Sequence, residues 1–120
     1  MKVEVKVTES FKRAAKPLLK RYRSFPDDLS ELERQLLKDP NLGTPLGGNV
    51  FKIRLKISSK GKGKSGGARV ISFVVLKNEV KGKRETISMV NLLTVYDKSD
   101  QSTITDSELR KLVEAQDISD

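Results

Sequence analysis

Positively charged side chains alternate with apolar ones over residues 51–57. Lys52, Arg54 and Lys56 occupy every second position, and a strand with this pattern holds its basic side chains about 6.5–7 Å apart on one face. This separation is close to that of phosphates along a nucleic acid strand. The chain has no His and no Cys, which excludes a Ser-His-Asp triad, a Cys nucleophile and a zinc finger. Acid–base chemistry would therefore depend on Lys, Arg, Tyr, Asp or Glu.

The net charge of +8 comes from one part of the chain. The 120-residue sequence has 24 basic and 16 acidic residues, and the segment from Pro40 to Asn78 has no acidic residue. Because this segment holds eight basic residues, the 16 basic and 16 acidic residues outside it cancel. A concentrated basic block is typical of a protein that binds a polyanion. Its members are Lys52, Arg54, Lys56, Lys60, Lys62, Lys64, Arg69 and Lys77.

Other interpretations of the basic block are weaker. Lysines on an edge strand can serve only to prevent aggregation. Gly63-Lys64-Ser65 matches the end of a Walker A motif, but residue 58 is Ser where that motif needs Gly, and a strand follows instead of a helix. The chain has neither a signal peptide's apolar run nor one long enough to span a membrane. We therefore expect a soluble cytoplasmic protein with no membrane partner.

Hydrophobic periodicity predicts an α+β domain over residues 1–120 with the order β-α-α-β-β-β-α. The predicted strands are 2–7, 51–57, 68–76 and 87–96. The first helix covers 9–23, with Pro17 inside it because the apolar stripe continues past that residue. A second helix begins within 24–28 and ends before Asp39, and a short helix follows a capping box at Thr105 and Glu108. The segments 41–49, 60–67 and 77–86 are predicted loops.

These elements predict one curved, mainly antiparallel sheet with an N-terminal helical hairpin and a short C-terminal helix. The helices are expected on one face of the sheet. Residues 68–76 are β-branched and apolar on both faces, which is typical of a central strand covered on both sides. The face on which Arg69 lies depends on strand register, which the sequence does not define.

Several stretches resemble the RelE/HigB branch of bacterial toxins from type II toxin–antitoxin modules. They are FKIRL at 51–55, KGKGKSGGARVI at 60–71 and LLTVYDK at 92–98, and Asn41-Leu42-Gly43 is also similar. The resemblance extends from about residue 10 to residue 113. It implies a ribosome-dependent endoribonuclease that cleaves messenger RNA in the ribosomal A site by attack of a ribose 2′-OH on the adjacent phosphate. It also implies a cognate antitoxin partner, and no metal or cofactor is expected.

The resemblance assigns roles to particular residues. Lys52 and Arg54 match the basic pair on the family's second strand, and Arg69 matches the arginine that opens its third strand, where it would stabilise transition-state charge. Lys98 matches a basic residue that acts as acid or phosphate ligand, while Tyr96 either stacks on a base or belongs to the core. Without His, a lysine crowded by cations is the natural general base, because neighbouring positive charges lower its pKa. The expected phosphate-binding residues also include Lys56, Lys60, Lys62 and Lys64.

The chain departs from parts of the family pattern. Some relatives use His and Asp near the fourth strand, and others use a Tyr near the C-terminus, but this chain has no His and no aromatic residue after Tyr96. Two alternative functions remain: a ParE-like toxin of the same fold that poisons DNA gyrase, and a non-catalytic basic protein that binds nucleic acid.

Overall fold

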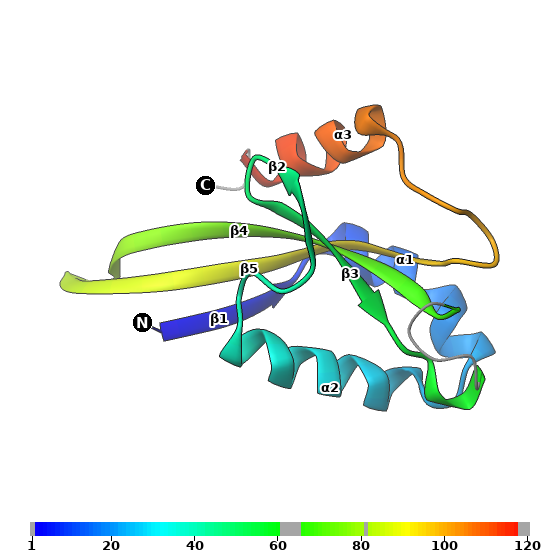
Figure 1. The fold of residues 1–120 in the computed structure, drawn as a ribbon. Coiled ribbons are helices and arrows are strands. Elements are labelled where there is room, and N and C mark those ends of the chain that lie inside the picture. Colours follow the sequence, from blue (N-terminus) through cyan, green and yellow to red (C-terminus); the bar gives the residue numbers. More distant parts are fainter. Residues whose placement is uncertain (1, 61–65, 81, 118–120) are drawn as a thin grey trace.

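The computed structural model describes residues 2–60, 66–80 and 82–117 (Figure 1). They form an open five-stranded sheet in the spatial order β1-β5-β4-β3-β2. β1 is parallel to β5, and the other three strand pairs are antiparallel. The α+β class and the mainly antiparallel sheet are therefore confirmed. The elements are β1 (Lys2–Val7), α1 (Glu9–Arg21), α2 (Phe25–Lys38), β2 (Thr44–Gly47), β3 (Val50–Leu55), the short 3₁₀ helix η1 (Ser58–Lys60), β4 (Ala68–Val80), β5 (Lys83–Asp97) and α3 (Asp106–Asp117).

The observed element order differs in detail from the predicted one. The predicted loop 41–49 contains β2, which pairs with the start of β3. Most of the predicted loop 77–86 belongs to β4 and β5, which extend as a two-stranded ribbon past the ends of β1 and β3 (Figure 1). Both predictions failed for the same reason. A short or solvent-exposed strand has little apolar alternation in its sequence.

Helices cover both faces of the sheet, whereas the sequence predicted them on one face. α1 and α2 lie on one face over the larger core, and α3 lies on the other (Figure 1). The core beneath α3 includes Val50, Ile71 and Leu93. β4 occupies the middle of the sheet, as its apolar sequence predicted. A central strand that is apolar on both faces needs cover on both, so α3 is required on the second face.

The first helix forms as predicted. The Thr8 hydroxyl accepts a hydrogen bond from the Phe11 N–H at 3.3 Å and donates one to the Leu92 carbonyl at 2.7 Å. α1 continues through Pro17 because its apolar side, including Phe11 and Leu18, is buried in the core. Leu19, which directly follows the buried Leu18, is 44% exposed. None of the described helices is long and apolar enough to cross a membrane.

Candidate functional site

Strand register places three of the predicted site residues in one row across the sheet. Arg54 of β3 lies opposite Arg69 of β4, and Arg69 lies opposite Tyr96 of β5. Residues paired in this way have Cβ atoms about 4.5–5.5 Å apart and share one face of the sheet. We call these residues the arginine row. Arg69 therefore lies on the same face as Arg54, which the sequence did not define.

Lys52 extends the arginine row along β3. It lies two residues before Arg54, so both side chains leave the strand on the same face, and its partner on β4 is Ile71. Val50 is two residues earlier and belongs with Ile71 to the core beneath α3. The arginine row therefore lies on the α3 face of the sheet, next to this small core and toward the end of β3.

Side chains of the arginine row are exposed on β3 and buried on β4 and β5. Lys52 is half-buried and Arg54 is exposed, whereas Arg69 and Tyr96 are only 5% and 6% exposed. The Arg69 guanidinium donates from Nη1 to the Ala68 carbonyl at 3.0 Å. Burial raises the pKa of the Tyr96 hydroxyl, and the positive charge of Arg69 partly opposes this effect. An anion held by Arg54 would meet the Arg69 charge in a less polar environment than bulk water, where the attraction is stronger.

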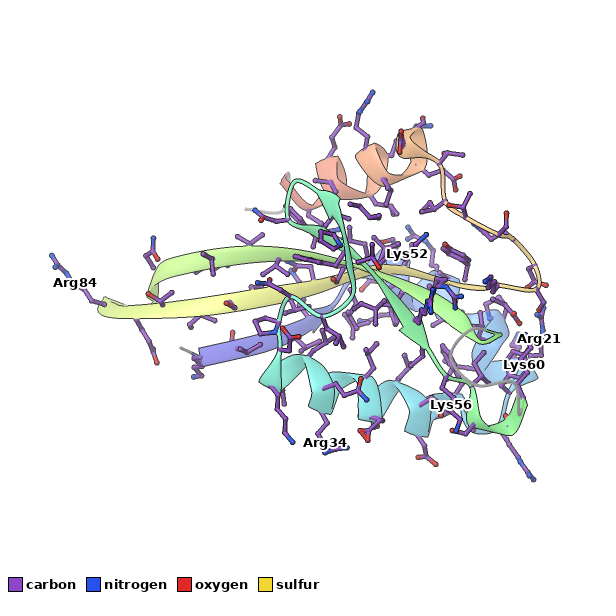
Figure 2. All side chains as sticks on the ribbon, viewed as in Figure 1. Arg21, Arg34, Lys52, Lys56, Lys60 and Arg84 are labelled. Carbon is purple, nitrogen blue, oxygen red and sulfur yellow. The ribbon has the colours of Figure 1, made fainter. Side chains whose placement is uncertain are left out.

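The basic alternation continues to Lys56, which lies in a different environment. Arg54 and Lys56 line a hollow of about 380 Å³ whose opposite wall comes from α2 and includes Asp27 and Glu31. Figure 2 shows Lys56 on the α2 side of the molecule and Lys52 near the centre of the sheet. Carboxylates in the opposite wall oppose the approach of a phosphate into this hollow, so Lys56 is less suited to phosphate binding than Lys52, and a phosphate would reach Arg54 from the Lys52 side.

Lys60 forms an ion pair with a buried acid. Its ammonium group donates to Asp97 Oδ1 at 2.9 Å and to Ser99 Oγ at 3.0 Å. The side chain of Lys60 is 14% exposed and that of Asp97 is fully buried. Arg21 also contacts Asp97, at 3.1 Å, and Figure 2 shows Arg21 and Lys60 close together where α1 ends. The predicted phosphate ligand Lys60 thus already has a carboxylate partner.

Asp97 is the centre of this group, which we call the Asp97 cluster. Burial alone would raise the pKa of Asp97, but hydrogen bonds from Ser99, Tyr22 and Lys60 outweigh it and hold the pKa well below its ordinary value. The bond to Asp97 in turn raises the pKa of Lys60. Both groups are therefore charged at neutral pH, and the cluster joins the end of α1, η1 and the end of β5.

The remaining predicted residues have fewer described contacts. Lys98 is exposed and directly follows Asp97, and its backbone N–H donates to the Gly67 carbonyl at 3.1 Å. This contact places Lys98 next to the start of β4, close in the chain to Arg69. Lys62 and Lys64 lie outside the described residues.

The sequence does not reveal the Asp97 cluster. Asp97 belongs to the LLTVYDK stretch at 92–98, and Tyr22 lies near the end of the predicted helix 9–23. The one available signal was a single acidic residue directly after a long apolar strand, which does not identify partners more than 35 positions away such as Lys60.

Within the ranges that the structure describes, no group of three or more His, Cys, Asp or Glu side chains is placed to hold a metal ion. No protein-family model matches this chain.

Proposed function

We propose that this chain is the toxin of a type II toxin–antitoxin module and a ribosome-dependent endoribonuclease of the RelE/HigB type. The observation that supports this proposal is the arginine row, with Lys52 beside it. One exposed and one buried guanidinium lie next to each other, and a lysine lies one pleat away on the same face. Such a surface can hold an RNA phosphate while the reaction increases its negative charge.

The proposed reaction is an in-line transesterification. The ribose 2′-oxygen forms a bond to the adjacent phosphorus, and the bond from phosphorus to the 5′-oxygen breaks. The products are a 2′,3′-cyclic phosphate and a 5′-OH. We assign removal of the 2′-OH proton to Lys52, stabilisation of the charge on the pentavalent phosphate to Arg54 and Arg69, and protonation of the 5′-oxygen to Lys98. Because Tyr96 is buried beside Arg69, we assign it to packing and not to base stacking.

The partners follow from the same chemistry. An A-site messenger RNA on the ribosome supplies the substrate phosphate, and an antitoxin neutralises the toxin. We expect the antitoxin segment to be acidic, because the face that it must cover contains Lys52 and Arg54. The proposed compartment is the cytoplasm, where ribosomes and messenger RNA occur.

The experiment adds purified protein to a translating extract and maps new 5′-OH ends on a reporter message. Arg54→Ala should reduce the cleavage rate about 100-fold or more, as expected for loss of one transition-state charge partner. Arg69→Lys tests the buried position while keeping a positive charge. The matched control is Arg110→Ala, an exposed arginine on α3, which should cleave at the parent rate.

Three results would contradict the proposal. Intact message in translating extract would exclude the ribonuclease. Inhibition of DNA gyrase supercoiling without RNA cleavage would support the ParE-like alternative. Salt-sensitive RNA binding with neither cleavage nor growth arrest would support a non-catalytic nucleic-acid binder.

A further inference from the structure

A second basic surface lies on α1, across the sheet from the arginine row. Arg13, Lys16 and Lys20 are exposed and are spaced i, i+3 and i+7, so they share one side of the helix. The opposite side of α1 is buried in the larger core. Arg23, two residues after the helix ends, is also exposed. We call these four residues the α1 cation row.

The α1 cation row is not neutralised by neighbouring acids. Residues 9–23 contain six basic residues and one acidic residue. The acid, Glu9, pairs with Lys12 at 3.3 Å, and Arg21 pairs with Asp97 and Asp100. In the part of the chain that the structure describes, no ion pair involves a member of the α1 cation row. The charge balance outside residues 40–78 therefore conceals a local excess of positive charge on α1.

Helix stability does not explain this excess. Like charges at i, i+3 and i, i+4 destabilise a helix by about 0.2–0.5 kcal/mol per pair, and Lys16 and Lys20 form such a pair. Basic residues favour the last turn of a helix, whereas Arg13 lies in the first half of α1. On α2, by contrast, Glu31 pairs with Arg34 one turn away. A surface that tolerates this repulsion fits an external anionic partner.

The surface has the dimensions of a short run of phosphates. Arg13 and Lys20 are about 10.5 Å apart along the helix axis, and Lys16 lies between them. At the start of α1, Lys6 and Arg13 line one hollow of about 420 Å³ together with Thr8, Glu9 and Ser10. Basic groups therefore extend from the end of β1 along the length of α1.

We propose that the α1 cation row and Lys6 bind the sugar–phosphate backbone of double-stranded RNA, independently of base sequence. An anionic membrane fits less well because an interfacial helix inserts its apolar face into the membrane. The apolar face of α1, which includes Phe11 and Leu18, is buried in the core. An acidic protein fits less well because protein interfaces depend on aromatic and apolar anchors, and the α1 cation row has none. Duplex RNA is recognised largely through its shape and phosphates, which straight rows of cations can follow.

The test measures binding of a fluorescein-labelled RNA duplex of about 16 base pairs, roughly the length that duplex-binding domains span. The variant is Arg13→Gln/Lys16→Gln/Lys20→Gln. The control variant changes one arginine and two lysines at exposed positions elsewhere, so it has the same net charge: Lys38→Gln/Arg84→Gln/Lys111→Gln. Both are also made in a Lys52→Ala/Arg54→Ala background, so that binding at the arginine row does not contribute.

Loss of three phosphate contacts should reduce the slope of log affinity against log salt concentration by about 2–3. Between 50 and 200 mM salt, the parent should therefore lose about 30-fold more affinity than the variant does. The control should change far less. The proposal is overturned if the α1 variant binds duplex RNA like the parent, or if both variants lose affinity equally. It is also overturned if the α1 variant loses binding to phosphatidylglycerol vesicles while RNA binding persists. No cleavage is measured, so failure of the ribonuclease proposal would leave this result unaffected.

Discussion

The Asp97 cluster should contribute more to stability than any exposed ion pair of the chain, and Asp97→Ala tests this. The Asp97 side chain is fully buried, and that of Lys60 is 14% exposed. Removal of the carboxylate leaves the Lys60 ammonium largely buried without its partner, and the Tyr22 hydroxyl loses its acceptor.

The expected loss follows from the burial of Lys60. Removal of one partner from a buried ion pair costs about 3–5 kcal/mol. Because Lys60 keeps some contact with water, we expect the lower end, about 3 kcal/mol. In a chain of this size such a loss lowers Tm by about 10–15 °C. Thermal unfolding followed by far-ultraviolet circular dichroism measures it, since the chain has no Trp for fluorescence.

Asp100→Ala is a matched control, because Asp100 binds the same Arg21 guanidinium at 2.9 Å but its side chain is 55% exposed. It should change Tm far less than Asp97→Ala does. Adding Lys60→Met to Asp97→Ala removes the uncompensated charge and should restore part of the lost stability. Equal losses for Asp97→Ala and Asp100→Ala would refute the reasoning. So would a double variant that is less stable than Asp97→Ala alone.

Three further predictions concern acid stability, β3–β4 packing and the α3 cap. The folded-state pKa of Asp97 lies below the unfolded value of about 3.9, so its stabilisation is complete above about pH 5 and is lost as pH falls through the folded pKa. Between pH 5 and 2, the free energy of unfolding measured by urea titration should fall less for Asp97→Asn than for the parent. Parallel curves of unfolding free energy against pH would contradict this. A Cβ added at Gly67 would lie 2.1 Å from the Leu55 carbonyl oxygen. A Cβ added at Gly82, whose φ is +77°, would have no atom within 4 Å. In urea denaturation, Gly67→Ala should therefore lower the free energy of unfolding more than Gly82→Ala, whose conformational strain is about 1 kcal/mol. The reverse order would refute the steric argument. Thr105 Oγ1 accepts the Glu108 N–H at 3.1 Å, so Thr105→Ala should cost about 1 kcal/mol and speed amide exchange in α3, and unchanged exchange would contradict a capping role.

Local periodicity was sufficient wherever an element's own residues determine its structure. β1 and α1 follow directly from a change of hydrophobic period near Thr8. The capping box at Thr105 forms as predicted, with Glu108 Oε1 accepting the Thr105 N–H at 3.3 Å. The basic alternation of residues 51–57 also correctly predicted that Lys52 and Arg54 share one face of a strand. Each of these features depends on side chains within a few residues of one another.

The sequence alone does not predict contacts between residues that are far apart in the chain. A shift of register by one residue would move Arg69 to the other face, so the sequence alone could not place it beside Arg54. The partner of Lys60 is 37 positions away, and a charge count treats both residues as free. The same count balanced the cations of α1 against acids elsewhere in the chain. Residue types and short-range spacing thus defined which charges are present, whereas the tertiary structure decided which are paired with an acid and which remain on the surface.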